Sequence, residues 1–579
     1  MSAEKLITDH IDIWTSAVQA KSASGRGSSK KRELYGIKKL RELILELAVR
    51  GKLVPQDPTD EPASVLLERI AVEKAQLVKE KKIKKPKALP KISNEKPFSV
   101  PESWTWTQLG FVTNYGVCEK AESKDVQDST WVLELEDVEK STSKLLRKVR
   151  FEDRSFKSSK NVFLKKDVIY GKLRPYLDKV IVADEAGVCT TEMIPMRGYC
   201  DFSPEFLRLV LKTPYFIEYA NSSTHGMNLP RMGTDKAREA LIPLAPINEQ
   251  HRIVAKVDEL MALCDQLEQQ TEASLDAHQV LVEALLATLT NSQDATELMA
   301  NWTRISEHFD TLFTTEQSID QLKQTILQLA VMGKLVPQDP NDEPAAKLLE
   351  RIAEEKAQLV KEKKIKKQKA LPLIAEDEKP FELPNGWEWC RVNDISLFTT
   401  SGSRDWARYY SESGALFVTM GNLSRGSYDL RMDNLRYVKP PIDGEGSRTK
   451  LEPHDLLISI TGDVGNLGLI PEGFGEAYIN QHTCLLRFMP ECRDKFFPEL
   501  MRSPFAKLQF DAPQRGIKNS FRLSDVGEMV IPLPPKEERT RITQKVDNMM
   551  SLCDQLKQRL RDSQQTQLQL TDAIVEQAL

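Results

Sequence analysis

Apolar side chains recur at alternating spacings of four and three residues in two long stretches of the chain. In each stretch these positions fall on one helix face, the a/d seam of a coiled coil. Pro246 and Pro535 lie just upstream, and the polar residues Asn248 and Lys536 open the two predicted helices. The seam positions are Ile253, Val257, Leu260, Cys264 and Leu267 in the first stretch, and Ile542, Val546, Met549, Cys553, Leu556 and Leu560 in the second.

Two shorter stripes show a related spacing of three, four and three residues. Their members are Ile37, Leu40, Ile44 and Leu47, and then Ile319, Leu322, Ile326 and Leu329. Gly51 and Gly333 follow these stripes and predict helix C-caps, with the segment LVPQDP as a stop. A further helix with a basic tail is predicted after each stop, over residues 63–85 and 345–367.

The chain repeats itself. Residues 51–90 return without a gap 282 positions later, at 333–372, with 35 of the 40 positions identical. Residues 242–267 return 289 positions later, as 531–556. The stretches between the repeated blocks do not obviously match each other. A duplicated frame that holds two unlike inserts suggests one task performed at two places, on two different targets.

The helical stripes can pair within the chain. A short connection lets residues 249–289 and 317–332 fold back as an antiparallel pair. By the same pattern, residues 34–50 should pair with residues 536–579, so that the N- and C-terminal segments meet in a circular, pseudo-two-fold arrangement. Such a pair is a stiff spacer, unlike a flexible linker. A dimerisation coiled coil between two chains is the alternative.

The two inserts, over residues 101–244 and 384–533, predict mixed strand and helix. Each opens with W-x-W, whose tryptophans (Trp104, Trp106, Trp387, Trp389) should begin a strand and pack inward. Short strands are predicted at 131–135, 167–170 and 180–182, and at 416–420, 455–460 and 484–488. One helix per insert should begin near Pro204 and near Pro498. We therefore predict an α+β protein with five segments: helical region 1–100, insert 101–244, helical spacer 245–383, insert 384–533 and C-terminal helix 534–579.

The amino-acid composition narrows the class of protein to which the chain can belong. A chain of 579 residues with 40% hydrophobic and 29% charged residues predicts several ordinary globular domains. No apolar run approaches a membrane span, and the first residues lack a signal-peptide core, so we expect a cytoplasmic protein. The eight cysteines form no C-x-x-C pair and the seven histidines do not cluster near them, which disfavours zinc and disulfides.

Charge is informative only locally. The net charge of −4 does not indicate a nucleic-acid binder. Residues 144–174, however, carry 11 basic residues against three acidic ones, and residues 502–522 carry five against one. Each insert thus contains one basic stretch. A solvated surface is the commoner explanation of such a stretch, and a DNA contact is the alternative.

Two segments in each insert carry residues suited to reading DNA: a strand-end loop, at 171–176 and correspondingly at 401–409, and a later segment, at 224–231 and correspondingly at 514–522. Arg, Lys, Asn and Gln make bidentate contacts with guanine and adenine edges, and basic neighbours bind phosphates. The candidates are Lys148, Arg150, Lys172, Arg174, Tyr176, His225, Asn228 and Arg231 in the first insert, and Arg404, Trp406, Arg408, Tyr409, Arg425, Arg515, Lys518, Asn519 and Arg522 in the second. No catalytic residue is predicted, since no Walker A sequence, S-adenosylmethionine loop or nucleophile–base arrangement is recognisable.

Several motifs together resemble the specificity (S) subunits of type I restriction–modification systems, in the branch called family B. They are LITDHIDIW at residues 6–14, YGIKKLRELILELAVRGKLVPQDP at 35–58, and the twofold pattern IP-x-x-P-x-x-E-(5)-I-x-x-K-V-D from Ile242 and Ile531. The resemblance covers essentially the whole chain.

The resemblance implies a division of labour. The inserts would be target recognition domains, each reading half of a bipartite, asymmetric double-stranded DNA sequence, with the helical regions as spacers. Two modification (methyltransferase) subunits and two restriction/translocase subunits would bind this non-catalytic chain and supply DNA methylation and host defence. S-adenosylmethionine, ATP and Mg²⁺ would belong to those partners. A coiled-coil scaffold without DNA binding and a self-contained DNA-modifying enzyme remain the alternatives.

Overall fold

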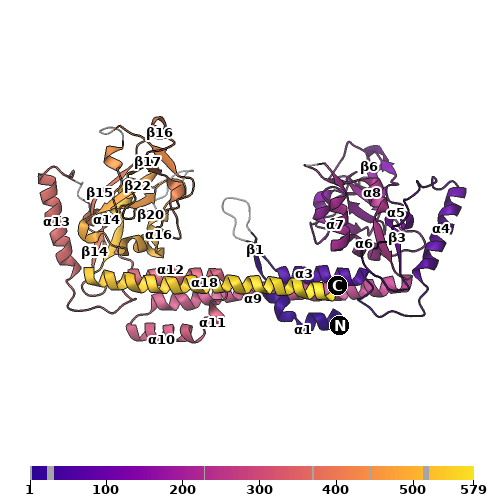
Figure 1. The fold of residues 1–579 in the computed structure, drawn as a ribbon, viewed down its shortest axis with the longest axis horizontal. Helices are drawn as coiled ribbons and strands as arrows, with labels where there is room; N and C mark the ends of the chain where they lie inside the picture. Colours follow the sequence, from indigo (N-terminus) through magenta and orange to yellow (C-terminus); the bar gives the residue numbers. More distant parts are fainter. Residues whose placement is uncertain (1–2, 22–30, 227, 368–370, 442–445, 513–520) are drawn as a thin grey trace. The chain divides into compact units, whose positions relative to one another are not determined.

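The computed structural model describes residues 3–21, 31–226, 228–367, 371–441, 446–512 and 521–579. The chain divides into two compact units, Met1–Ser274 with Ser563–Leu579, and Leu275–Asp562. Two long helices, α9 (Ile247–Asn291) and α18 (Lys536–Ala578), each contribute residues to both units (Figure 1). Among the described helices, none combines the length and apolar composition that crossing a membrane requires.

In the first unit, α3 (Tyr35–Val49) packs against the beginning of α9 and the end of α18. Arg41 pairs with Glu268 at 2.7 Å, and Gln56 donates to Glu249 at 2.5 Å, so α3 and α9 run antiparallel here. The Tyr35 hydroxyl donates to Asp572 at 2.7 Å. The N-terminal and C-terminal segments therefore pair as predicted, but they run parallel and not antiparallel, since Lys52, beyond the other end of α3, donates to the Leu579 carbonyl at 2.6 Å.

The second unit repeats these contacts. Here α12 (Glu316–Val331) runs antiparallel to α18, and near the middle of α18 Lys557 pairs with Asp320 at 2.8 Å and Arg561 with Glu316 at 2.8 Å. Seam positions in both units are buried: Leu40, Leu260 and Ile319 are 0% exposed. Leu267, Met549, Leu556 and Leu560 are only half-buried, and Met550 is buried beside Met549.

The predicted antiparallel direction of the central pair is also wrong. Residues 275–291 of α9 and α12 lie parallel, because Gln321 donates to Glu283 at 2.7 Å and Lys334 donates to the Ser292 carbonyl at 2.8 Å. The connection between them is itself helical. It comprises α10 (Ala295–Glu307) and α11 (Phe309–Leu312), and α10 makes the return, with Asn301 bonded to Ser292. The chain therefore reverses twice before α12 begins.

Both predicted glycine caps are present. Gly51 has φ +67° and Gly333 has φ +68°, the left-handed conformation of a helix C′ residue. The following amides close the motif, since Lys52 N–H donates to the Leu47 carbonyl at 3.0 Å and Lys334 N–H to the Leu329 carbonyl at 2.9 Å. The next helices, α4 (Ala63–Lys79) and α13 (Ala345–Lys361), end six residues earlier than predicted, because the lysine-rich tails turn away.

The first insert begins where β3 pairs antiparallel with β13, the strand that leads into α9. Its other strands form a four-stranded sheet in the order β4-β6-β9-β5, a three-stranded sheet β10-β7-β8 and the hairpin β11-β12. The elements are β3 (Thr105–Gln108), α5 (Leu109–Val112), β4 (Lys120–Ala121), β5 (Trp131–Leu133), β6 (Lys160–Phe163), β7 (Val168–Gly171), β8 (Val180–Val182), β9 (Gly187–Cys189), β10 (Met193–Met196), α6 (Pro204–Lys212), α7 (Pro214–Ser222), β11 (Thr224–His225), β12 (Arg231–Met232), α8 (Thr234–Glu239) and β13 (Leu241–Leu244). Ahead of α3 lie α1 (Ala3–Asp9), α2 (Ile11–Ser16), β1 (Gln19–Lys21) and β2 (Lys31–Glu33).

The second insert has the corresponding plan. Strand β14 pairs with β23, and two four-stranded sheets follow the orders β15-β22-β19-β20 and β16-β18-β17-β21. The elements are β14 (Glu388–Arg391), α14 (Val392–Ile395), β15 (Ser396–Ser401), β16 (Tyr410–Ser411), β17 (Ala415–Val418), β18 (Arg436–Val438), β19 (Leu456–Ser459), β20 (Leu467–Leu469), β21 (Ala477–Ile479), β22 (Thr483–Phe488), α15 (Phe496–Arg502), α16 (Pro504–Asp511), α17 (Leu523–Glu528) and β23 (Val530–Leu533). The predicted α+β class is confirmed.

Equivalent ion pairs and buried tryptophans show that the inserts share a fold. Arg197 pairs with Asp167 at 2.8 Å in the first insert, and Arg487 pairs with Asp455 at 2.7 Å in the second. The opening tryptophans pack inward as predicted, and Trp104 and Trp387 are each 5% exposed. The prediction of one helix per insert was incomplete. A second helix follows directly in each, as α7 and α16, and begins with a capping Thr or Ser and a proline.

Candidate nucleic-acid interface

The two predicted reading segments of the first insert meet in space. The loop that follows β7 runs beside the β11–β12 hairpin, where Leu173 and Arg231 form an isolated bridge. Arg174 N–H donates to the Pro230 carbonyl at 2.7 Å, and Met232 N–H donates to the Lys172 carbonyl at 3.0 Å. Residues separated by about 60 positions in the sequence thus form one surface.

Both positively and negatively charged side chains line this surface. Arg231 is held by Glu192, whose two carboxylate oxygens each accept from Nε at 3.0 Å. Arg174 is exposed, Lys172 is half-buried, and neither has an ion-pair partner among the described residues. Tyr176, His225 and Asn228 are also exposed. The surface can therefore offer cations to phosphates and polar groups to base edges.

Hydrogen bonds from Lys212 and Ser143 hold the loop that follows β7 at Asp178. Lys212 on α6 bonds to Asp178 at 2.5 Å, and the Ser143 hydroxyl donates to the Asp178 carbonyl at 2.6 Å. Burial raises the pKa of Asp178 to about 6, although Lys212 opposes the rise. Arg174 and Asp178 both adopt left-handed backbone conformations, with φ +52° and +49°. A non-glycine residue persists in that conformation only where its surroundings impose it, so the loop has a defined shape.

Lys148 and Arg150 lie elsewhere. Lys148 pairs with Asp184 at 2.8 Å and sits 4.6 Å from the centre of the Trp131 ring, and Arg150 pairs with Glu185 at 2.7 Å. The structure therefore does not bring these two residues together with the loop that follows β7.

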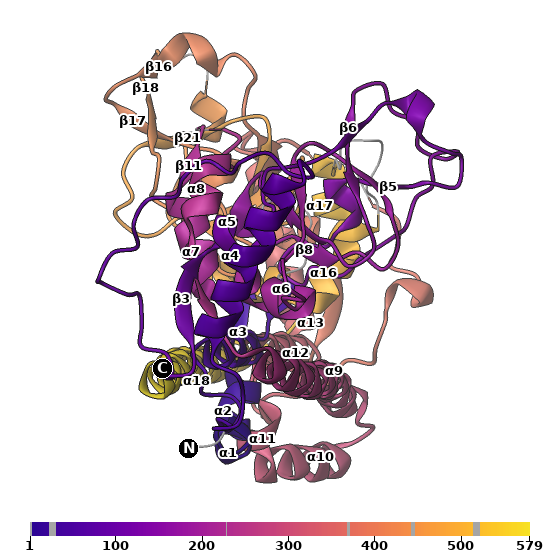
Figure 2. The same ribbon diagram turned by 90° about the vertical axis from the view of Figure 1, so that its right-hand side faces the viewer.

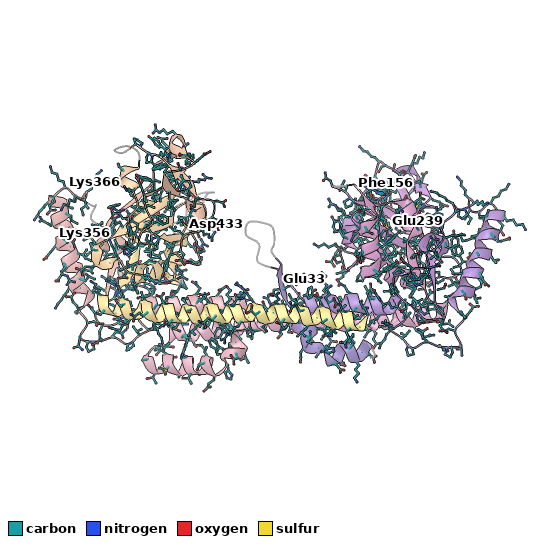
Figure 3. All side chains as sticks on the ribbon, in the orientation of Figure 1. Glu33, Phe156, Glu239, Lys356, Lys366 and Asp433 are labelled. Carbon is teal, nitrogen blue, oxygen red and sulfur yellow. The ribbon has the colours of Figure 1, made fainter. Side chains whose placement is uncertain are left out.

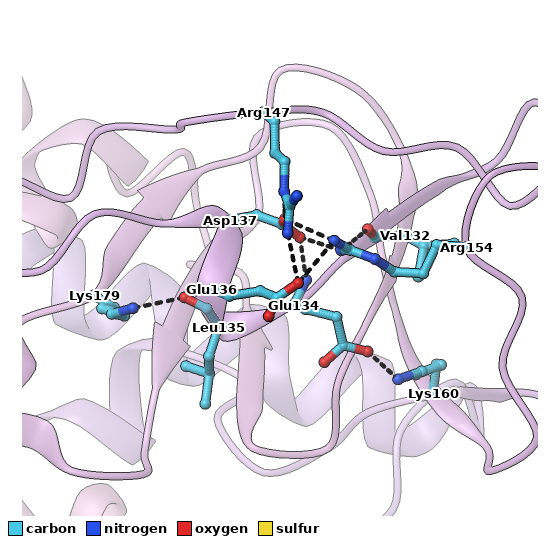
Figure 4. Close-up of polar contacts among 9 residues, drawn as sticks. All are labelled: Val132, Glu134, Leu135, Glu136, Asp137, Arg147, Arg154, Lys160 and Lys179. Atoms are coloured by element: carbon cyan, nitrogen blue, oxygen red, sulfur yellow. Dashed lines mark hydrogen bonds and ion pairs between the residues drawn. The ribbon is translucent and has the colours of Figure 1, made fainter. Parts of the chain in front are cut away.

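Much of the basic stretch at 144–174 is neutralised inside the domain (Figure 4). Arg147 donates to Asp137 at 2.7 Å, Arg154 contacts the same carboxylate, and Lys160 pairs with Glu134. Burial pushes the pKa of Asp137 up, but the bonds from Arg154, the Glu134 backbone and Arg147 outweigh it and hold that pKa below its usual range. These cations stabilise the domain and are poor candidates for DNA contacts.

Among the candidates of the second insert, Trp406 is corrected by the structure. Its ring is 2% exposed and packs in a small core with Phe417, Val438 and Tyr478. A base cannot stack on a ring in that position. The neighbouring Arg404 and Arg408 are exposed, and Arg408 lies 5.1 Å from the centre of the half-buried Tyr409 ring.

Two of the remaining candidates, Arg425 and Arg522, lie around another loop. Arg425 donates to the Val464 carbonyl at 2.8 Å and pairs with Asp463 at 3.0 Å. Arg522 is exposed and follows Phe521, whose N–H donates to the Ile460 carbonyl at 2.9 Å. The other three candidates, Arg515, Lys518 and Asn519, lie outside the described residues.

This loop, residues 460–466, is the equivalent of the loop after β7. Ile460 N–H donates to the His482 carbonyl at 3.0 Å, as Lys172 N–H donates to the Glu192 carbonyl at 3.0 Å. The bond from Phe521 to Ile460 matches the bond from Met232 to Lys172. Sequence reasoning had paired residues 401–409 with the first insert's loop, and the structure corrects that pairing.

A sequence signal for this equivalence existed. Each loop follows a strand that begins after an aspartate, Asp167 or Asp455, and each aspartate has an arginine partner about 30 residues later, Arg197 or Arg487. Aligning those pairs places Lys172 with Ile460 and Glu192 with His482. Sequence reasoning missed Thr461, Gln481 and His482 because they are not basic and their stretch is not charged.

A helix stands beside each insert in the same way. Lys74 of α4 donates to the Phe111 carbonyl at 2.7 Å, where Figure 2 shows α4 alongside α5. Lys356 of α13, labelled in Figure 3, donates to the Asn393 carbonyl at 2.5 Å. Burial, together with the nearby charge of Arg238, lowers the pKa of Lys74 to about 8. These repeated contacts attach the duplicated frame to each insert.

Across the described ranges, no three His, Cys, Asp or Glu side chains are grouped so that they could hold a metal ion. The described cysteines are free thiols, and burial raises the pKa of Cys264 to about 11. The candidate interface is therefore described by the polar and cationic side chains of its loops.

Comparison with known proteins identifies the family. No protein-family model matches the chain. The specificity subunit of the type I restriction enzyme EcoAI from Escherichia coli is 43% identical over 602 residues, and that of EcoEI from the same species is 42% identical over 619 residues. Both alignments cover 100% of each chain.

A solved structure supports the fold. It was reported under the description "Structural basis underlying complex assembly and conformational transition of the type I R-M system". The TM-score is 0.50 at 19% identity, and the match covers 83% of this chain and 99% of that one. Full-length identity above 40% to two relatives decides the family. This chain belongs to the specificity subunits of type I restriction enzymes.

Proposed function

We propose that this chain selects the DNA target of a type I restriction–modification enzyme and carries no catalytic site of its own. Two recognition domains, within residues 101–244 and 384–533, each read one half of a bipartite, asymmetric sequence. One observation supports this most directly. The same backbone frame presents Lys172, Arg174 and Arg231 in the first domain, and Thr461, Gln481 and His482 in the second. Unlike side chains on one frame are what two unlike half-sites require.

The duplicated helices serve as spacer and scaffold. Each unit repeats the same contacts, such as the bond from Trp104 to Glu249 at 2.9 Å and from Trp387 to Glu538 at 2.9 Å. Equivalent surfaces can bind equivalent partners, so we propose two methyltransferase subunits per chain, joined by two restriction subunits. The solved relative's description of complex assembly supports partner binding in general terms.

The cofactors belong to those partners. S-adenosylmethionine would supply the methyl group to adenine, and ATP and Mg²⁺ would serve the restriction subunits. The net charge of −4 supports shared DNA binding, because phosphate contacts drive affinity and this chain has no excess of cations. The complex acts on the cell's DNA, so we place it in the cytoplasm.

The direct test is a map of methylated adenines. Cells that carry this chain and its methyltransferase subunit should show a split motif around a fixed gap, and cells lacking only this chain should not. Replacing residues 107–240 with the insert of another family member should change one half-site and leave the other half-site and the gap unchanged. A change in both half-sites would refute the modular reading.

The same experiment separates the alternatives. If the methyltransferase subunit stays bound to the chain but no methylation depends on the chain, a scaffold without DNA recognition is favoured. If the purified chain methylates DNA alone, it is itself an enzyme. The spacer has its own test, because deleting four residues within 249–289 should change the gap or abolish assembly while both half-sites stay the same.

A further inference from the structure

Three polar side chains of the second recognition domain form a connected relay at the loop 460–466. The Thr461 hydroxyl lies 2.8 Å from His482 Nδ1, and Gln481 Nε2 lies 2.9 Å from His482 Nε2. The Thr461 hydroxyl donates to Met420 Sδ at 3.6 Å. All three polar side chains are half-buried, and Gly462 and Asp463 beside them are exposed.

With the Gln481 amide oriented as in the structure, donor and acceptor rules give the direction of every bond in the relay. An amide nitrogen donates and cannot accept, so His482 Nε2 must be the acceptor from Gln481. The proton of the neutral imidazole then sits on Nδ1, which donates to the Thr461 oxygen. The Thr461 proton is then free to point to Met420 Sδ, which lies 3.6 Å away and can only accept. The relay therefore holds the Gln481 amide in one orientation.

This orientation leaves one edge of the amide unused. Gln481 has one N–H engaged with His482, which leaves its other N–H and its carbonyl oxygen. Within the described residues, that oxygen has no hydrogen-bond partner. A donor and an acceptor side by side on one amide match the N7 acceptor and N6 donor of adenine in the major groove.

The surroundings are compatible with DNA. Asp463 would repel phosphate, but Arg425 pairs with it at 3.0 Å. Ser459 accepts the Asn466 N–H at 2.9 Å and its hydroxyl donates to the Asp463 carbonyl, so the loop has a defined shape. In the first domain, the position of His482 is taken by Glu192, which holds Arg231 instead. The equivalent side chains Glu192 and His482 thus hold a cation in one domain and a neutral amide in the other.

We propose that Gln481 reads an adenine in the half-site of the second recognition domain, and that His482 and Thr461 are positioning residues that hold its amide. This proposal rests on the proposed function and specifies a base-reading residue for it. The relevant half-site is the one that stays unchanged when residues 107–240 are exchanged.

The test uses the chain in complex with its methyltransferase subunit. Duplexes that carry each of the four bases at every position of both half-sites are compared for binding and methylation. Gln481→Ala should lose roughly 10- to 100-fold of its discrimination at one position, where the wild type prefers adenine. The near-isosteric Gln481→Glu should shift the preference at that position to cytosine, because a carboxylate accepts from the cytosine N4 amine.

The positioning role has a separate readout. His482→Ala should weaken discrimination at the same position, and the double variant Gln481→Ala/His482→Ala should lose no more than Gln481→Ala alone. Such non-additivity is the signature of one residue acting through another. Additive losses, or losses spread over every position, would indicate a merely structural His482 and overturn that part.

A matched control is Glu472→Gln. Glu472 bonds to His454 at 3.0 Å, before the start of β19, whereas the relay follows the end of that strand. It should leave both half-sites unchanged. A wild-type complex with no split, chain-dependent motif would refute the proposed function. A wild-type motif that both Gln481 variants leave unaltered, or that has no adenine in this half-site, would overturn only this inference.

Discussion

Replacing Gly51 with alanine should destabilise the junction between α3 and the first recognition domain. Gly51 has φ +67°, and a Cβ built there would lie 2.5 Å from Pro101 Cγ and 3.3 Å from the Trp104 ring. The glycine that ends α3 therefore also packs against the first residues of the first insert. Gly333 repeats the geometry against Pro384 and Trp387 in the second unit.

Two unfavourable effects and one favourable effect set the change in the free energy of local opening. A left-handed conformation costs a non-glycine residue roughly 1–2 kcal/mol. Overpacking against Pro101 costs about 1–3 kcal/mol, because a proline ring carried on the backbone cannot simply rotate away. Alanine also restricts the unfolded chain, which returns about 0.4–1 kcal/mol. The free energy of local opening should fall by about 3 kcal/mol.

Hydrogen exchange is the suitable assay, since a chain with several domains need not unfold in two states. The reporter is the Lys52 amide, which is bonded to the Leu47 carbonyl at 3.0 Å. Its exchange should accelerate by about 100-fold in Gly51→Ala, since 1.4 kcal/mol corresponds to tenfold. Gly426→Ala is the control, because nothing lies within 4 Å of its added Cβ. Exchange at the wild-type rate in Gly51→Ala would refute the reasoning.

Three further changes have defined outcomes. Glu316→Gln should remove a pH-dependent contribution to the stability of the folded chain. The hydrogen bond from Arg561 lowers the pKa of Glu316 to about 2. The ionised carboxylate therefore stabilises the fold above its usual pKa of 4.5, and this stabilisation is lost as the pH falls towards 2. Thermal unfolding from pH 7 to 3 should show a wild-type advantage that shrinks with acid and does not exceed about 1 kcal/mol. Asp455→Ala should cost about 1–3 kcal/mol in denaturant unfolding, because the largely buried Arg487 loses two hydrogen bonds and keeps only those to Glu452 and the Lys450 carbonyl, and an unchanged stability would contradict this. Trp406→Ala should cost about 3–5 kcal/mol by emptying the core beside Phe417, and loss of DNA binding with unchanged stability would return Trp406 to the reading surface.

Local patterns predicted much of the frame correctly. The apolar spacing identified the helix seams, and positions such as Leu40 and Ile319 are fully buried. The glycines after α3 and α12 identified both helix ends, since their left-handed backbone is a local requirement. Over residues 204–222 the same patterns predicted one helix where the structure has two. The helix α7 begins directly after α6, at Thr213, with no separating loop to mark it.

The candidate site was predicted less completely. The sequence pointed to Lys172, Arg174 and Arg231, which do lie together. It also included Trp406, whose burial depends on strands β17, β18 and β21 supplying the rings around it. It passed over Gln481, whose orientation depends on a histidine and on a threonine 20 residues away. Residue type alone does not distinguish a surface arginine from one that is paired inside the domain.

The sequence by itself determined the duplicated frame, the helix seams, the caps and the family, because these follow from residue spacing and identity along the chain. The tertiary structure alone decided the parallel course of α12 beside residues 275–291, the neutralisation of the basic stretch by Asp137, and the equivalence of the loops that follow β7 and β19. Each of these depends on which distant residues pair. Pairing is set by the packing of the whole domain, and spacing along the chain carries little record of it.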